Sequence, residues 1–144
     1  MRLPTSMLSD SERSMLLEQL ARSGSTLAET YTHEGRARTP SCGDEVTVRA
    51  TLQGSEIQEI SGSGHGCTVS MAALAAMCGL GPISLPEFSE LHTRYTAAVN
   101  GDGELDGDLE PFANIGRFPL RGQCATLAWR ALESAVHVEA VPEV

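Results

Sequence analysis

The sequence is poor in positive charge. Its 144 residues include 10 Lys and Arg against 19 Asp and Glu, which gives a formal net charge of −9 at pH 7. Proteins that hold a nucleic-acid backbone or an anionic membrane surface generally present a basic field to it. We therefore expect neither nucleic acid nor a membrane as a partner.

Long hydrophobic runs are also missing. No uninterrupted apolar run approaches the roughly 20 residues that a membrane-spanning helix needs, and the start, MRLPTSMLSDSERSM, lacks the apolar core of a secretory signal. We therefore expect a cytoplasmic protein, in which thiols stay reduced. The four cysteines, Cys42, Cys67, Cys78 and Cys124, are then better interpreted as metal ligands, nucleophiles or core residues than as disulfide partners.

The pattern of apolar residues predicts a mixed α+β protein. A chain of this length with 41% hydrophobic residues can fill one core, so we expect a single domain over residues 1–144. Helical spacing predicts helices over 8–29, 67–78, 86–100 and 124–138, with Ser9 or Ser11 as the first N-cap and Gly24 as a point where the first helix could break. Alternation predicts a hairpin of strands over 46–52 and 55–64, whereas 32–44 has the composition of an exposed loop.

An acidic, glycine-rich stretch, GDGELDGDLEPF, follows the third predicted helix. It invites comparison with a calcium-binding EF-hand loop, whose last ligand is a glutamate at the twelfth position. Counting from Asp102, that position holds Ala113. The sequence therefore favours a solvated turn here.

Three of the cysteines share a placement at the boundaries of predicted elements. Cys42 lies in a turn before a strand, Cys67 follows a Gly-x-Gly-x-Gly run at a helix start, and Cys124 follows Arg-Gly-Gln at another. The free N–H groups and positive dipole end of a helix N-terminus favour thiolate over thiol. Thiolate is the form that binds metal or attacks sulfur. By contrast, Cys78 in an alanine-rich helix is typical of a small core residue.

A nearby carboxylate would complete a metal site. Cys42, Asp44, Cys67 and Cys124 form a chemically sensible Cys3Asp set for tetrahedral Zn2+, and Gly43 lets the first two turn towards one point. Their spacing alone is a weak signal, because the fold would have to bring them together. Unrelated structural cysteines and an ordinary turn aspartate are the alternatives. His65 is either a turn residue or a hydrogen-bond partner of a ligand.

Two stretches resemble the SufU branch of the NifU/IscU iron–sulfur cluster assembly proteins. They are PSCGDEVTVRATLQGSEIQEISGSGHGCTVSMAALAAM and GDLEPFANIGRFPLRGQCATLAWRAL. The similarity covers residues 38–133 and rests on the contexts CGD, GxGC and RxxCATLAW. It implies that Cys42, Asp44, Cys67 and Cys124 bind zinc, that Cys42 accepts persulfide sulfur, and that Arg121 assists the exchange. It also implies a small antiparallel sheet of about three strands, with helices packed on one face.

Two features favour the SufU branch over the IscU type. The IscU type carries a histidine ligand directly before its last cysteine, where this chain has Gln123. The SufU type has an insertion of about twenty residues between the second and third cysteines, which the segment 82–117 accommodates. This chain differs from the family pattern in residues 1–37. There the family usually shows a tyrosine-rich helix followed by an HYxxPRN-like stretch, which this chain lacks.

The resemblance implies a role in iron–sulfur cluster assembly. The protein would be a zinc-dependent sulfurtransferase that takes persulfide sulfur from a SufS-type cysteine desulfurase, alongside other SUF assembly proteins. Two alternatives stay open. The same thiolates could assemble a transient [2Fe–2S] cluster, or the zinc could be purely structural and serve a protein-binding domain.

Overall fold

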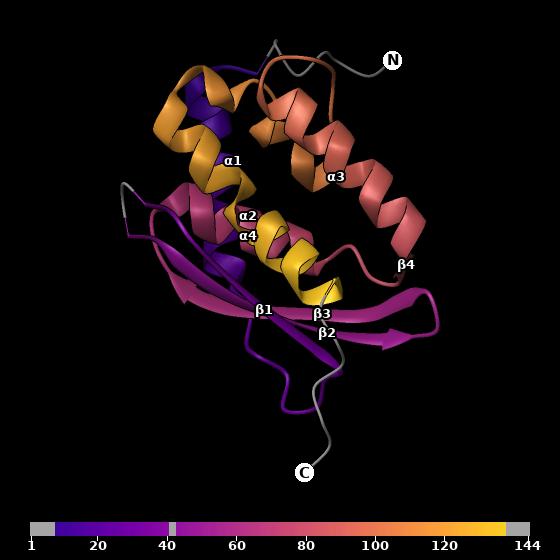
Figure 1. The fold of residues 1–144 in the computed structure, drawn as a ribbon. Helices are drawn as coiled ribbons and strands as arrows, with labels where there is room; N and C mark the ends of the chain where they lie inside the picture. Colours follow the sequence, from indigo (N-terminus) through magenta and orange to yellow (C-terminus); the bar gives the residue numbers. More distant parts are fainter. Residues whose placement is uncertain (1–7, 41–42, 138–144) are drawn as a thin grey trace.

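The computed structural model describes residues 8–40 and 43–137 (Figure 1). The elements, in chain order, are α1 (Asp10–Ser23), β1 (His33–Arg38), β2 (Glu45–Gln53), β3 (Glu56–His65), α2 (Thr68–Cys78), β4 (Ile83–Ser84), α3 (Leu85–Val99), the 3-10 helices η2 (Gly107–Phe112) and η3 (Ile115–Arg117), and α4 (Pro119–Val136). None of the helices in these ranges is long and apolar enough to cross a membrane.

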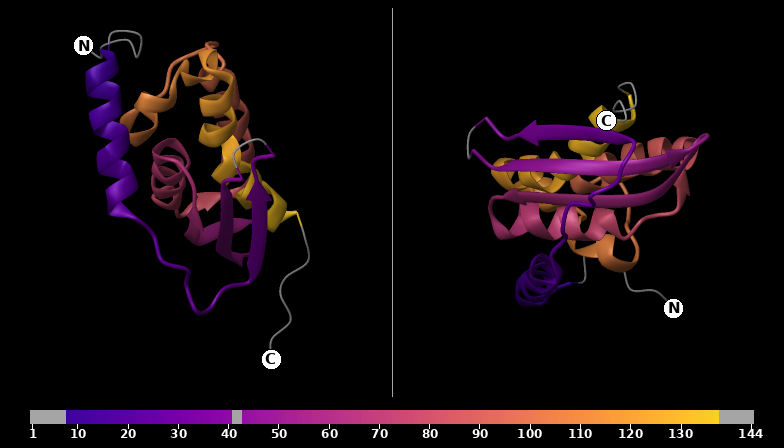
Figure 2. Two further views of the ribbon diagram at one scale, coloured as in Figure 1. Left: turned by 90° about the vertical axis from the view of Figure 1, so that its left-hand side faces the viewer. Right: turned by 90° about the horizontal axis from the view of Figure 1, so that it is seen from below.

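The sheet is antiparallel with strand order β1-β2-β3-β4, and the helices lie on one of its faces (Figure 2). The alternation in β2 places Val46, Val48 and Ala50 on the buried face, against which α4 packs. The predicted α+β class, with helices on one face, is confirmed. The sheet has four strands rather than about three, because the short β4 adds two residues beside β3.

The predicted loop over residues 32–44 is wrong in its first half. Residues 33–38 form the edge strand β1, which pairs with β2 along its whole length. The sequence HEGRAR gives no apolar alternation because Gly35, on the buried face, lies against the backbone of α4. A Cβ atom at Gly35 would collide with the carbonyl oxygen of Ala131. The buried position of β1 is therefore a glycine, and it lacks the apolar side chain that would have indicated a strand in the sequence.

The core between the sheet and the helices is centred on α2 and α4. Met77, Leu127 and Trp129 are fully buried. The rings of Tyr95 and Trp129 stack with centroids 4.2 Å apart, and the Tyr95 hydroxyl donates to the carbonyl of Ala125 at 2.7 Å. These contacts attach α3, which belongs to the long segment between Cys67 and Cys124, to the C-terminal helix.

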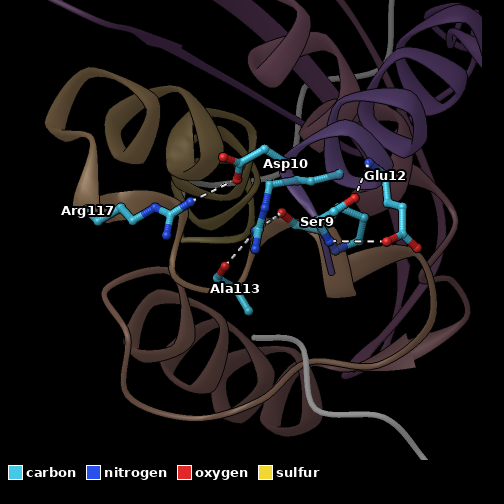
Figure 3. A network of polar contacts seen from close by, with 7 residues as sticks. Ser9, Asp10, Glu12, Ala113 and Arg117 are labelled. Atoms are coloured by element: carbon cyan, nitrogen blue, oxygen red, sulfur yellow. Dashed lines mark hydrogen bonds and ion pairs between the residues drawn. The ribbon is translucent and has the colours of Figure 1, made fainter. Parts of the chain in front are cut away.

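The first helix is anchored at its N-terminal end (Figure 3). Ser9 and Glu12 form a reciprocal capping box, which confirms Ser9 as the N-cap. The buried guanidinium of Arg13 donates to the carbonyls of Pro111 and Ala113 at 2.6 and 2.7 Å. The helix ends at Ser23 rather than at residue 29, because Gly24 takes a positive φ of 64°. The anchored helix packs against α2.

Candidate metal centre

Three elements bring a carboxylate and two thiols together. Asp44 directly precedes β2, Cys67 is the N-cap of α2, and Cys124 lies inside α4. Their ligand atoms all lie within 4.8 Å of one another, and within 8–40 and 43–137 no other trio of His, Cys, Asp or Glu side chains meets that limit. Three of the four predicted ligands therefore meet, while the predicted ligand and nucleophile Cys42 lies outside the described residues.

The predicted helix start at Cys124 is wrong. The last helix begins at Pro119, which occupies the first turn as prolines often do, so Cys124 follows one and a half turns later. Cys124 as a residue is only 3% exposed. The inward face of α4, rather than a free helix terminus, therefore brings this sulfur to the site.

The carboxylate of Asp44 is held by a network of hydrogen bonds. Its backbone N–H donates to Thr39 Oγ1 at 3.0 Å, and Gly43 takes a positive φ of 72° in the turn before it. Its Oδ2 accepts from Ser70 Oγ at 2.7 Å and from the backbone N–H of Cys67 at 3.2 Å. Burial alone would raise the pKa of Asp44, but these hydrogen bonds outweigh it and hold the pKa below its usual value.

Glycine at position 66 makes room for this carboxylate. A Cβ atom there would lie 2.7 Å from the Asp44 carboxyl carbon, well inside van der Waals contact. The Gly66 backbone therefore lets Asp44 approach the start of α2 and accept the Cys67 N–H. Any larger residue would displace the carboxylate from the thiols.

The two thiols of this trio differ in environment. Cys67 is exposed, whereas burial, together with the nearby Cys67 and Asp44 side chains, raises the pKa of Cys124 to about 12. The Cys124 thiol donates to Asp44 Oδ2 at 3.4 Å. A bound metal ion would replace that proton, since cysteine binds metal as thiolate. Two sulfurs and one carboxylate oxygen this close fit the donor set of a zinc ion.

A surface cavity of about 480 Å3 opens beside the thiols. Residues of α1, including Leu17, form one wall, and Leu120 and Arg121 of α4 line it together with Cys67 and Cys124. The Arg121 guanidinium lies 5.0 Å from the ring centre of Phe118. Arg121, predicted to assist chemistry at the cysteines, thus shares a cavity with two of them.

The other residues singled out from the sequence, Cys78 and His65, are not part of the trio. Cys78 is half-buried against the core, and burial raises the pKa of its thiol, as expected of a core residue. His65 is exposed at the end of β3. Sequence reasoning missed Ser70 and Gly66. The position of Ser70 could have indicated its contact with the site. It lies three residues after the N-cap Cys67, where a side chain can turn back towards the start of the helix.

Two known proteins of iron–sulfur cluster assembly are similar in sequence to this chain. The zinc-dependent sulfurtransferase SufU of Bacillus subtilis strain 168 is 31% identical over 105 residues, covering 69% of this chain and 71% of the relative. The iron–sulfur cluster assembly scaffold protein IscU of Streptococcus pyogenes serotype M1 is 34% identical over 104 residues, covering 67% of this chain and 64% of its own length. No family model matches.

Solved structures share the fold. A candidate iron–sulfur cluster assembly scaffold protein for the SUF system from Fervidobacterium islandicum AW-1 superposes with a TM-score of 0.71 at 26% identity, covering 85% of this chain and 97% of that one. The N-terminal part of a NifU-like protein from Brucella abortus superposes with a TM-score of 0.74 at 16% identity, covering 84% and 89%.

Proposed function

We propose that this chain, which belongs to the SufU/IscU-type family of iron–sulfur cluster assembly proteins, is a zinc-dependent sulfur acceptor. It takes persulfide sulfur from a cysteine desulfurase of the SufS type, with Cys42 as the accepting thiol. The observation that carries this proposal is the meeting of Asp44, Cys67 and Cys124 within 4.8 Å, beside a cavity that reaches the surface.

Four residues of this chain would hold the zinc ion. Asp44, Cys67 and Cys124 supply the donor atoms that lie together, and Cys42, two residues before Asp44, supplies the fourth. Bound zinc keeps ligating cysteines as thiolates at neutral pH and protects them from oxidation. The carboxylate is a harder and less well matched donor than a fourth thiolate would be. A Cys3Asp set therefore suits a zinc site in which one ligand is exchanged during sulfur transfer.

The transfer itself is a thiolate–persulfide exchange. The Cys42 thiolate attacks the outer sulfur of the desulfurase persulfide, and a new sulfur–sulfur bond forms as the bond to the desulfurase cysteine breaks. The desulfurase cysteine leaves as a thiolate, and Cys42 carries the persulfide. Charge and oxidation level balance, because one thiolate and one persulfide exchange places. Arg121, lining the cavity, would stabilise the thiolates on either side of this exchange.

A second candidate function is assembly of a transient [2Fe–2S] cluster as cargo on the same thiolates. The similarity to a scaffold protein named IscU favours it. Anaerobic reconstitution with iron and sulfide, followed by visible absorption, distinguishes it from sulfur relay, since a cluster absorbs in the visible range and zinc does not. A purely structural zinc domain is less well supported, because Cys67 is exposed and closed structural sites resist exchange.

The test is direct detection of the transferred sulfur. The zinc-loaded protein is incubated with a SufS-type desulfurase and cysteine, and intact-protein and peptide mass spectrometry locate any added sulfur atom. We expect it on the peptide that contains Cys42. Cys78→Ala is the matched control, because Cys78 belongs to the core, and it should still accept sulfur. Sulfur arriving on Cys42→Ala protein at the wild-type rate would remove the assignment.

A further inference from the structure

An exposed aromatic side chain stands at the start of α4, next to the thiol cavity. Phe118 is 46% exposed and does not belong to the hydrophobic core. Its backbone is held on both sides, because its N–H donates to the Ile115 carbonyl at 3.1 Å and its carbonyl accepts from the Gly122 N–H at 3.0 Å. The following Pro119 also restricts Phe118 to extended backbone angles. The ring therefore projects from a fixed backbone, and core packing does not explain it.

Two guanidinium groups lie beside this ring. The guanidinium carbons of Arg117 and Arg121 are each 5.0 Å from the ring centroid of Phe118, within the roughly 6 Å over which a cation is attracted to an aromatic face. Arg117 has a second partner, because it donates to the Asp10 carboxylate of α1 at 3.1 Å (Figure 3). By contrast, no carboxylate in the described part of the chain forms an ion pair with Arg121. The place of the Arg121 guanidinium therefore depends on the ring.

The start of a helix is an unfavourable position for a positive charge. Arg121 is the third residue of α4, where the positive end of the helix dipole repels a cation. A long side chain there gains by turning its charged end into water. The negative face of the Phe118 ring opposes that movement. Because Arg121 lines the cavity together with Cys67 and Cys124, the ring keeps a positive charge beside the thiols.

We propose that Phe118 is a positioning residue for sulfur exchange, and that its ring holds the Arg121 guanidinium at the cavity of the thiol site. This inference rests on the proposed function, in which Arg121 stabilises the thiolates on either side of the exchange. Phe118 does not itself line that cavity, so it acts through Arg121. The contact between a cation and an exposed ring is strong enough to change a rate about two- to fivefold.

The first experiment compares two replacements of Phe118 in the sulfur-acceptance assay, with the zinc-loaded full chain and a SufS-type desulfurase. Phe118→Tyr keeps the ring, whereas Phe118→Leu keeps only an apolar side chain. We expect Phe118→Leu to lower the maximal rate about two- to fivefold, with the half-saturating desulfurase concentration unchanged, and Phe118→Tyr to match the wild type. Adding Phe118→Leu to Arg121→Ala should lower the rate no further. A loss that persists in the Arg121→Ala background would overturn the proposal, as would weaker saturation by the desulfurase.

A second measurement reports on the Arg121 charge without any sulfur transfer. Cys67 is exposed, and a nearby cation favours its reaction with the anionic iodoacetate over its reaction with the neutral iodoacetamide. Peptide mass spectrometry gives the ratio of the two alkylation rates at Cys67 in the zinc-loaded protein. We expect this ratio to fall in Phe118→Leu and in Arg121→Ala. It should keep its wild-type value in Phe118→Tyr and in Arg94→Ala, which removes the same charge at an exposed position of α3.

The two measurements separate this inference from the function on which it rests. If the wild-type protein accepts no sulfur, the relay is contradicted, while a lowered alkylation ratio in Phe118→Leu still shows that the ring holds Arg121 beside the thiols. If the wild type accepts sulfur and Phe118→Leu equals it in both rate and alkylation ratio, the relay stands and the positioning role of Phe118 is contradicted.

Discussion

Ser70 Oγ donates to Asp44 Oδ2 at 2.7 Å, joining two buried residues that lie 26 positions apart in the sequence. The Cys67 thiol lies 3.7 Å from the same hydroxyl. Ser70 therefore touches two of the three clustered ligands without belonging to a usual zinc donor class. It acts as a positioning residue that orients the carboxylate.

Removing this hydroxyl should weaken metal binding. Groups that orient metal ligands typically contribute about 10–100-fold in affinity, so we expect Ser70→Ala to lower zinc affinity by that order while the protein stays folded. Competition with a chromophoric chelator measures it. Ser89→Ala, at an exposed position of α3, is the matched control. Equal zinc affinities in the two variants would show that Ser70 does not orient Asp44.

A methyl group at position 66 should damage the same site by crowding. Gly66→Ala would place its Cβ 2.7 Å from the Asp44 carboxyl carbon, so the carboxylate must move away from the thiols. We expect a loss of zinc affinity of at least tenfold. Gly79→Ala, where the added Cβ meets only the Ala76 carbonyl at 3.4 Å, should retain wild-type zinc content. Elemental analysis of the purified proteins decides between retention and loss.

The buried Arg13 should be a stability determinant rather than a site residue. Its guanidinium makes two hydrogen bonds to carbonyls of η2 and the residue that follows it, and hydrogen bonds from charged groups contribute about 1.5–3 kcal/mol each. We expect Arg13→Ala to lower the free energy of unfolding by about 2 kcal/mol or more in urea titrations. Arg22→Ala, in an exposed ion pair of the same helix, should change it little. Equal effects would contradict the anchoring role.

Arg121 should affect sulfur transfer and leave metal content unchanged. The side chain lines the cavity with Cys67 and Cys124, but guanidinium is not a metal ligand. We expect Arg121→Ala to lower the rate of sulfur acceptance by about tenfold or more, in line with roughly 1.4 kcal/mol of lost charge stabilisation per factor of ten. The exposed Arg94→Ala is the control. A parallel loss of zinc in Arg121→Ala would point to a structural role.

The sequence predicted those parts of the fold that rest on local patterns. The strand β2 follows from alternation, β3 follows from a less strict alternation after the Gln53-Gly54 turn, and α2 and α3 follow from helical spacing and from the turn residues that bound them. The edge strand β1 was not predicted, because its buried position is Gly35. This glycine packs closely against Ala131 and adds no apolar residue to the pattern. The start of α4 was placed five residues late, although Pro119 in its first turn is an ordinary start signal.

The site could be predicted only in part, because its members are far apart in the chain. Asp44 and Cys124 are separated by 80 positions, and no spacing rule brings such residues together. Placement at element boundaries and donor chemistry suggested the set, the resemblance to a family supported it, and the fold places Asp44, Cys67 and Cys124 within reach of one another. Ser70 was missed because a helical serine is usually interpreted through its own helix and not through a strand end 26 residues earlier.

The measurement that tests the central claim most directly is desulfurase turnover. Alanine release by a SufS-type cysteine desulfurase is followed alone, with the zinc-loaded protein, and with its Cys42→Ala form. We predict strong stimulation by the wild-type protein and by Cys78→Ala, and none by Cys42→Ala. Absence of stimulation by the wild-type protein, with one equivalent of zinc bound, would contradict sulfur acceptance and leave a scaffold or a structural zinc domain as the function.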